Sequence, residues 1–349
     1  ILNYNAFGSK VDDITTDPKV LDEIAQRFAP VVYLHPSEPY YPSDVEFLLE
    51  NSIMAFGKEN SDDGVYYIDP GSGKNTSAPS QLSQSSLQNF AINISGTTYR
   101  SNSPTHPGDD DTIFRLVGNE TIQEDRSKTW YIPPNKPPPA YYRIHTGQAD
   151  KKIYDIEYWL FYPYNGPTFH GLTPHEGDWE QATLRVYVDE NAKADEPKSQ
   201  VLGVWMSTHS DGGWWASSIY QSSGSNIGPL DFEEEHPIVY SAINSHANYG
   251  TIGTHKYSGF LEDHTDKGQR WPIADNLIKI LEDTDRQFDV EKTEVLNNQL
   301  WVKFRGKWGR YVNYVVDIGS GPITPIEAGN INDPAQWKSQ KFPFNPIPK

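Results

Sequence analysis

The chain of 349 residues contains no cysteine, which excludes disulfide bonds and thiol chemistry and by itself favours an intracellular protein. It also lacks any apolar run close to the ~18 residues that a membrane-spanning helix needs. Basic residues are outnumbered, because 29 Lys and Arg stand against 47 Asp and Glu and give a formal net charge of −18. Without a basic patch such a chain repels phosphate backbones. We therefore expect no nucleic-acid partner and no integral membrane segment.

Two other features favour secretion. The chain begins at Ile1 and not at Met, as a processed product would. Three N-x-Ser/Thr acceptor sites lie at Asn75, Asn93 and Asn119, all in a polar region rich in Ser and Asn. We expect a secreted glycoprotein whose signal peptide has been removed.

Proline and glycine are frequent, with 27 and 26 residues, while long helical patterns are rare. This texture predicts a mainly β fold, and we expect a β-sandwich with long loops and a few short helices. One helix is expected after Asp17, with Pro18 at its first position, and a second over residues 273–281. The expected strands are 31–36, 153–162, 180–188, 201–207, 213–220, 237–243 and 311–316.

We expect one β-rich domain over residues 1–349, acting as a monomer. Residues 1–140 would form a loop-rich N-terminal part with one helix packed on the sandwich. Residues 141–320 would form the core sandwich that carries the site, and residues 321–349 an extended C-terminal tail. The proline-rich stretch 133–142 is expected to be an extended linker or edge segment.

Residues 175–180 read HEGDWE and run directly into a predicted strand. Side chains alternate along a strand, so Glu180 shares a face with Ala182 and Leu184. That face is apolar and should point into the core, with Asp178 and Glu180 at its leading edge. Bare carboxylates are costly to bury, so another group has to compensate them.

A divalent cation would provide that compensation. Asn165 lies in a turn ten residues before His175, and a hairpin would place Asn165, His175, Asp178 and Glu180 around one end of a sheet. Oxygen ligands with one imidazole suit Ca²⁺ or Mg²⁺ best, while Mn²⁺ or Zn²⁺ is possible because of the histidine. The alternative is an acidic loop in which Trp179 is a packing anchor.

Two further segments carry histidines at strand ends. His209 and Asp211 lie in THSDGGWW, and His246 lies in INSHANYG. If the three strand ends meet at one rim, these residues converge with His175 and are candidates for acid/base catalysis. The alternative is that His209 and His246 satisfy backbone groups at turns. The neighbouring residues expected to contact a substrate are Glu176, Trp214, Trp215 and Tyr249, although tryptophans are often core.

Five segments keep an order and spacing that resemble a known family. They are RFAPVVYLHPSEPYYPSDVEFLL (Arg27–Leu49), YWLFYPYNG (Tyr158–Gly166), HEGDWEQATLRV (His175–Val186), STHSDGGWW (Ser207–Trp215) and HPIVYSAINSHANYG (His236–Gly250). Together they resemble the vacuolar protein sorting-associated protein 62 family of fungi and plants over about residues 27–260. That family name comes from a sorting phenotype and implies little biochemistry.

A more distant similarity is to the necrosis- and ethylene-inducing-peptide-like proteins, which are secreted β-sandwich cytolysins. YPYN, which ends at Asn165, resembles their Tyr/Phe-Pro-x-Asp segment, and HEGDWE keeps their H-x-x-D-x-E spacing. This resemblance implies Asn165, His175, Asp178 and Glu180 as ligands of a divalent cation. The chain departs from that family in having Asn165 in place of Asp and in lacking its cysteines.

These observations favour a secreted, divalent-metal-dependent hydrolase or lyase that acts on a polysaccharide or glycoconjugate. Two alternatives remain. One is a glycan- or glycolipid-binding, membrane-damaging protein, and the other is a non-catalytic module stabilised by metal. The enzyme is preferred because three histidines and several acids at strand ends exceed what cation-mediated binding needs.

Overall fold

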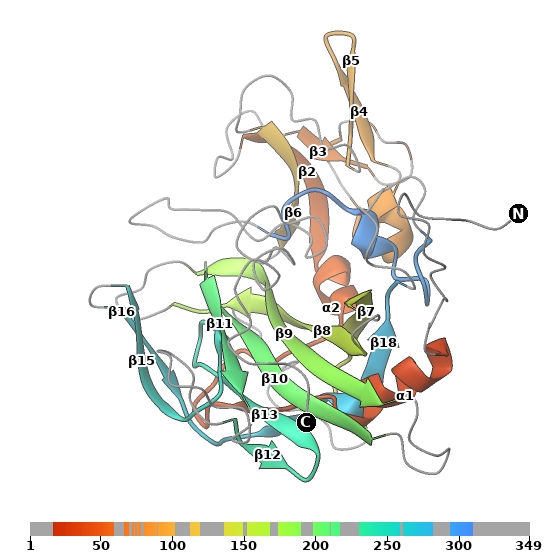
Figure 1. The fold of residues 1–349 in the computed structure, drawn as a ribbon. Helices are drawn as coiled ribbons and strands as arrows, with labels where there is room; N and C mark the ends of the chain where they lie inside the picture. Colours follow the sequence, from red (N-terminus) through yellow and green to blue (C-terminus); the bar gives the residue numbers. More distant parts are fainter. Residues whose placement is uncertain are drawn as a thin grey trace, which may run out of the picture.

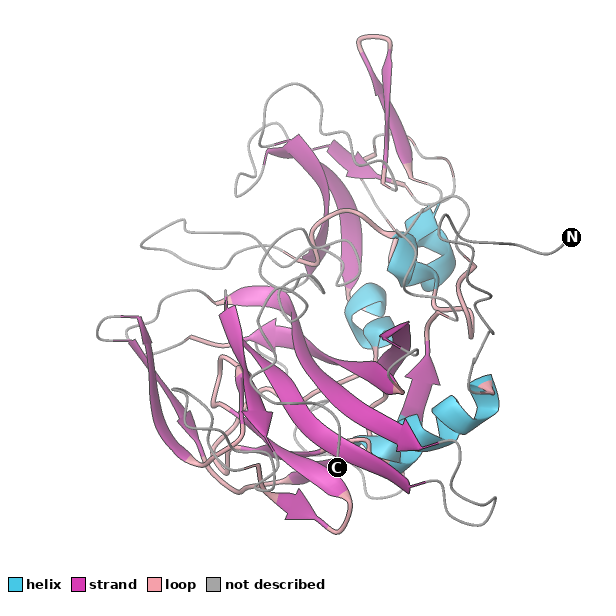
Figure 2. Cartoon of the chain, in the orientation of Figure 1, coloured by secondary structure: helices cyan, strands magenta, loops and turns pink. Residues whose placement is uncertain are grey.

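Strands dominate the computed structural model, and the helices in its described part are few and short (Figure 1, Figure 2). The mainly β fold expected from the sequence is confirmed. No helix in the described part of the chain is long and apolar enough to cross a membrane. The structure describes residues 17–58, 66–69, 72, 74, 76–77, 80–88, 90–101, 112–118, 136–148, 152–167, 174–189, 198–209, 211–216, 230–258, 261–281 and 294–309.

A six-stranded sheet forms the middle of the fold, in the order β11-β10-β9-β8-β7-β18. Its neighbours are antiparallel except for β18, which runs parallel to β7. The strands are β7 (Ala140–Gln148), β8 (Ile153–Asn165), β9 (His175–Asp189), β10 (Lys198–Thr208), β11 (Asp211–Ala216) and β18 (Leu277–Lys279). The alternating runs in the sequence therefore correctly predict β8 to β11.

A second sheet, in the order β12-β13-β1-β17 with β14 beside β13, covers one face of the first. Its strands are β1 (Val31–Leu34), β12 (Phe232–Glu233), β13 (His236–Ser241), β14 (Asn248–Tyr249) and β17 (Arg270–Pro272). β1 pairs with β13 in parallel. The apolar face of β9 packs against this sheet, as predicted, and completes the sandwich. The core between the sheets includes Val32, Leu160, Leu184, Val186, Val239 and Trp271.

The first helix, α1 (Pro18–Arg27), matches its prediction. The Asp17 carboxylate accepts a hydrogen bond from the Lys19 N–H (2.9 Å) and caps the helix, and Pro18 fills the first helical position. Leu21 and Ile24 on its apolar stripe enter the core of the sandwich.

The other face of the six-stranded sheet is covered as well. Trp159 and Trp179 from that face pack with Trp301 and Trp308 in a second apolar core. The elements around this core are α2 (Val45–Glu50), β2 (Ser52–Lys58), β3 (Tyr66–Ile68), η1 (Gln84–Gln88), β6 (Thr112–Gly118) and η6 (Leu300–Lys303). Two hairpins, β4 (Ala91–Ile94) with β5 (Thr97–Arg100) and β15 (Gly253–Ser258) with β16 (Leu261–Thr265), stand at the edges (Figure 1).

Two sequence expectations differ from the structure. The end of the stretch 133–142 is not a linker, because β7 begins at Ala140 and lies inside the central sheet. The second helix over 273–281 is wrong: a 3₁₀ turn, η5 (Ile273–Asn276), leads into β18, whose pairing with β7 outweighs the helical spacing. The strand expected at 311–316 lies outside the described residues, and the subdivision at residues 140 and 320 stays a prediction.

Candidate cation and ligand site

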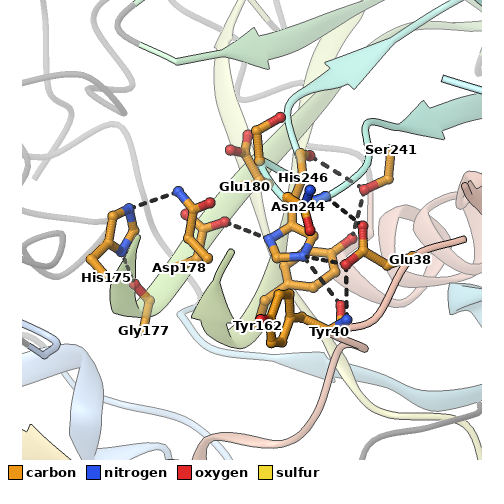
Figure 3. A network of polar contacts seen from close by, with 12 residues as sticks. Glu38, Tyr40, Tyr162, His175, Gly177, Asp178, Glu180, Ser241, Asn244 and His246 are labelled. Carbon is orange, nitrogen blue, oxygen red and sulfur yellow. Dashed lines mark hydrogen bonds and ion pairs between the residues drawn. The ribbon is translucent and has the colours of Figure 1, made fainter. Parts of the chain in front are cut away.

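The candidate site lies at the end of the β8–β9 hairpin that carries Asn165, His175, Asp178 and Glu180, and we call this end the rim. The register of the hairpin places Asn165 opposite His175. Gly177 lies within β9 with φ +64°, and a Cβ there would lie 1.9 Å from the carbonyl oxygen of Trp308. This close approach requires glycine. The positive φ alters the direction of the neighbouring side chains, and His175 and Asp178 lie on the same side of the hairpin (Figure 3).

His175 and Asn165 form the outer part of the rim. The Nδ1–H of His175 donates to the carbonyl oxygen of Gly177 (2.8 Å), so Nε2 accepts from the Asn165 side-chain amide (2.9 Å). The Oδ1 atom of Asn165 is buried and has no hydrogen-bond partner. The imidazole lone pair accepts the hydrogen bond from the Asn165 amide, so His175 could bind a metal only after the bond to Asn165 breaks. Oδ1 of Asn165 is an unsatisfied carbonyl oxygen, and both atoms are metal-ligand types.

Asp178 is compensated by a histidine from another segment. Its Oδ2 atom lies 2.8 Å from Nδ1 of His246, which is fully buried and stacks on Tyr162 with ring centroids 3.8 Å apart. On the far side, Nε2 of His246 lies 3.2 Å from the carbonyl oxygen of Tyr40 and 3.5 Å from Oε1 of Glu38 (Figure 3). Burial alone would lower the pKa of His246, but the two carboxylates outweigh it and raise this pKa to about 9. The imidazolium therefore lies between Asp178 and Glu38 and offsets part of the charge of both.

Glu180 is not compensated in this way. Its carboxylate accepts a hydrogen bond from the Ser207 hydroxyl, a neutral group. Burial and then the nearby charge of Asp178 raise the pKa of Glu180 well above its usual range, and Asp263 adds to the effect. Within the described residues, Glu180 is thus a buried carboxyl beside like charge with a hydroxyl as its partner.

A third histidine, His209, lies next to this cluster. Nε2 of His209 is 2.6 Å from Oδ2 of Asp263, and the hydroxyls of Ser245 and Tyr249 each donate to the same carboxylate at 2.7 Å. Burial alone would raise the pKa of Asp263, but these contacts, led by that of His209, lower it. The His209 side chain is 25% exposed. Asp263 therefore holds a partly exposed imidazole in one orientation.

The structure brings together the three segments that carry the predicted histidines. Asp178 contacts His246, Glu180 contacts Ser207, and Ser245 contacts the carboxylate that orients His209. The rim therefore contains His175, His209 and His246 of the predicted acid/base residues. The side chain of Asp211, at the start of β11, lies outside what the structure describes.

The four residues expected to contact a substrate are dispersed. Glu176 points away from the rim and accepts a hydrogen bond from the Gly118 N–H (2.9 Å). Trp214 is buried on the opposite face of the sheet beside Trp205. Tyr249 lies at the rim, stacked on a histidine ring and bound to Asp263, with the half-buried Trp215 packed near it. Of the four, Tyr249 and Trp215 lie on the side of the site.

Sequence reasoning missed several members of the rim. Glu38 and Asp263 come from segments more than 80 residues from HEGDWE, and nothing in their local pattern marks them. Ser245 and Ser207 lie inside the predicted segments but are ordinary serines. β10 pairs with β9, but β13 and β16 belong to other sheets, so only the tertiary packing of these sheets brings the four residues to the rim.

Within the described ranges, no group of three or more His, Asp or Glu side chains is arranged to hold a metal ion. Two observations on individual residues of the rim are compatible with a divalent cation. One is the orphaned Oδ1 atom of Asn165 beside the imidazole of His175. The other is the raised pKa of Glu180, which the charge of a cation would reverse. The hydrogen bonds to Asp178 and Glu180 occupy oxygens that a cation would otherwise take.

Residues 140–333 match the sequence model of the vacuolar protein sorting-associated protein 62 family, Vps62, and this range is more than half of the chain. The chain belongs to the Vps62 family. A curated relative, TDA6 of Saccharomyces cerevisiae, which carries the same vacuolar protein sorting-associated name, is 23% identical over 328 residues. That alignment covers 85% of this Vps62 chain and 63% of TDA6, so the chain spans less than two thirds of its relative.

Solved structures of necrosis- and ethylene-inducing proteins also align with this Vps62 chain. Necrosis and ethylene inducing protein 2, from the causal agent of witches' broom disease of cocoa, is 16% identical, with 76% of this chain and 74% of that chain covered and a TM-score of 0.30. NLPPya in complex with glucosamine is 13% identical, with 76% and 74% covered and a TM-score of 0.27. Alignments this loose say nothing about individual side chains.

Proposed function

We propose that this Vps62-family chain binds a divalent cation at the rim of β8 and β9 and, through it, an oxygen-rich glycan or glycolipid head group. The observation that carries the proposal is the pair of buried carboxylates at Asp178 and Glu180. The His246 imidazolium lies against the first, and among the described residues the partner of the second is a neutral hydroxyl. A buried carboxyl whose ionised form lacks a counter-charge is typical of a binding site and costly in a purely structural one.

The residues proposed to hold the cation are Asn165, His175, Asp178 and Glu180. Three oxygen donors and one imidazole favour Ca²⁺ or Mg²⁺, and the imidazole admits Mn²⁺ or Zn²⁺. A bound cation would supply positive charge and open positions for the hydroxyls of a sugar. His246 would keep Asp178 oriented from behind, and the His209 imidazole would meet the part of the ligand that extends beyond the cation.

The test begins with the metal. The parent chain and a His175→Ala, Asp178→Ala double variant are purified, and their metal content is measured by elemental analysis after incubation with Ca²⁺, Mg²⁺, Mn²⁺ and Zn²⁺. We expect stoichiometric metal in the parent and none in the double variant. A Glu262→Gln variant, which removes an acid on the neighbouring β16 without touching the rim, should bind like the parent. A metal-free parent would contradict the proposal.

The ligand is then sought with glycans and vesicles containing glycosylated lipids, each with and without a chelator. Glucosamine and mannosamine, the sugars bound in NLPPya complexes, serve as first probes. Binding that disappears with the chelator supports recognition, and metal-dependent leakage of the vesicles would identify membrane damage. Chelation that lowers the melting temperature while no probe binds would instead favour a metal-stabilised module.

A second candidate function is a secreted, metal-dependent hydrolase or lyase acting on a glycan. It is favoured by one observation, the partly exposed His209 imidazole that the buried Asp263 orients. His246 is less suited to direct proton transfer because it is fully buried. Turnover of any member of a glycan panel that is lost in both His209→Gln and Asp263→Asn would support the enzyme, and binding without turnover would leave recognition as the function.

A further inference from the structure

The β4–β5 hairpin is a feature that the rim does not use. Its two strands pair only with each other in the described part of the chain, and the hairpin extends outward beyond β2, β3 and β6 (Figure 1). Its tip carries one of the three N-x-Ser/Thr sequons, Asn93-Ile94-Ser95. The side chains of Asn93 and Ser95 are both exposed. A bulky group on Asn93 would therefore extend into solvent without displacing packed residues.

The hydrogen bonds of Asn93 leave its side-chain nitrogen available for substitution. Oδ1 accepts from the Gly96 N–H (3.1 Å), which fixes the amide at the surface of the strand. Nδ2 lies 3.3 Å from the hydroxyl of Thr98, the residue opposite it in β5. A side-chain amide has two N–H groups, so substitution of one hydrogen leaves the other for Thr98.

A groove with a volume of about 550 Å³ opens beside this asparagine. Ile92 and Ile94 line it from the hairpin, Tyr66 from the edge strand β3, and Lys74 from the segment that follows β3. Tyr66 is 37% exposed, one of only three large hydrophobic side chains in the described chain that reach this exposure. Ile92 is buried in the second core, so the apolar surface for sugar rings comes from Tyr66 and the partly buried Ile94, and Lys74 provides a donor for their oxygens.

We propose that Asn93 is N-glycosylated and that the inner sugars of the glycan lie in this groove against Tyr66. The donor is a lipid-diphosphate-linked oligosaccharide. Nδ2 of Asn93 attacks its anomeric carbon, a C–N bond forms, the C–O bond to the diphosphate breaks, and the amide nitrogen loses one proton while the lipid diphosphate leaves. The occupant of the groove follows from covalent attachment, because the acceptor residue is part of the lining.

Occupancy is tested on the full chain, produced behind a secretion signal in a eukaryotic host, by mass spectrometry of glycopeptides. We expect sugar on Asn93 in the parent and in Ser95→Thr, which keeps the sequon. Both Asn93→Gln and Ser95→Ala should lose it, although Ser95→Ala retains the asparagine. An unmodified Asn93 in the secreted parent overturns the proposal, whatever the state of Asn75 and Asn119 and independently of any cation at the rim.

Whether the glycan lies in the groove is tested in an Asn75→Gln, Asn119→Gln double variant, in which Asn93 is the remaining sequon. The native protein is treated with an endoglycosidase that cuts between the two innermost sugars, and the rate of release is followed by mass. Packing on Tyr66 should protect that bond, so Tyr66→Ala should release the glycan several-fold faster while Tyr66→Phe, which keeps the ring, matches the parent. Equal rates in all three proteins would contradict the seating in the groove.

Discussion

β8 and β9 bury acidic side chains on both of their faces. The partners of these side chains and the direction of their pKa shifts differ between the two faces. On the face away from the sandwich core, Glu157 accepts hydrogen bonds from Arg143, His145 (2.8 Å) and Gln181 (2.6 Å). Burial alone would raise the pKa of Glu157, but the charge of Arg143 and the contact with His145 outweigh it and lower this pKa to about 2. At the rim, the pKa of Glu180 moves in the opposite direction.

The comparison separates a structural charge from a functional one. Asp155 is also fully paired, because Arg185 donates to both of its oxygens at 2.7 and 2.9 Å and places its guanidinium 4.9 Å from the ring centre of Trp214. A carboxylate paired in this way contributes to the fold and needs no ligand. Glu180 lies beside the like charge of Asp178, so its ionised form would be stabilised by a bound cation.

The largest expected effect comes from unpairing Glu157. Arg143→Met should lower the free energy of unfolding by about 3–5 kcal/mol, because it leaves a buried carboxylate without its counter-charge. Urea denaturation of the parent and the variant measures the loss. An Arg143→Met, Glu157→Met double variant should regain most of it, and a double variant as unstable as the single one would show that packing, not charge, is responsible.

The next effect concerns the imidazolium at the rim. The pKa of His246 is raised from 6.5 to about 9, so its contribution to stability is complete below pH 6.5 and is lost as the pH rises through 9. Over this window the parent should lose on the order of 3 kcal/mol that a His246→Gln variant does not lose. Unfolding free energies measured across the window test this. His264→Gln, a control on β16, should follow the parent.

Glu180→Gln should change stability in the direction opposite to Arg143→Met. In chelated protein the variant should be more stable than the parent at neutral pH, because the raised pKa of Glu180 marks an ionised form that is costly in the fold. At a cation concentration of 100 times Kd, the parent should gain about 2.7 kcal/mol and the variant nothing. Thermal unfolding with and without chelator measures both. A less stable variant under chelation would remove the distinction between the two faces.

The smallest effect is expected at the surface. Arg27 and Glu235 form an ion pair whose side chains are 43% and 52% exposed. Glu235→Gln should change the free energy of unfolding by less than about 1 kcal/mol, since water and salt screen such pairs. Urea denaturation of the parent and of Glu235→Gln measures this change in the free energy of unfolding. A loss comparable to that of Arg143→Met would mean that burial does not separate structural from incidental charges in this protein.

The sequence contained enough to predict the hairpin and its rim. The alternation of side chains along β9 placed Glu180 on the core-facing side. A hairpin was predicted to bring Asn165 and His175 to one end of a sheet; Asn165 is the last residue of β8 and not a turn residue, and it pairs with His175. The contact between His246 and Asp178 was not predictable. It depends on the long-range pairing of β1 with β13 and on the packing of the two sheets against each other. The burial of the opposite face was not predicted either: Gln181, Thr183 and Arg185 are polar, yet all three are buried.

Local pattern failed where tertiary pairing decides the conformation. Residues 277–279 have helical spacing with their neighbours but extend along β7, and the proline-rich run before Ala140 conceals the start of that strand. The positive φ at Gly177 left no periodic signal either, although it alters the direction of the neighbouring side chains at the rim.

The most direct test of the account is a calorimetric titration of chelator-treated parent and Glu180→Gln with Ca²⁺, Mg²⁺, Mn²⁺ and Zn²⁺. If Glu180 is the carboxylate that lacks its counter-charge, the parent should bind at least one of these ions stoichiometrically and Glu180→Gln should bind none of them comparably. A parent that binds no ion, or a variant that binds as tightly as the parent, would contradict the account.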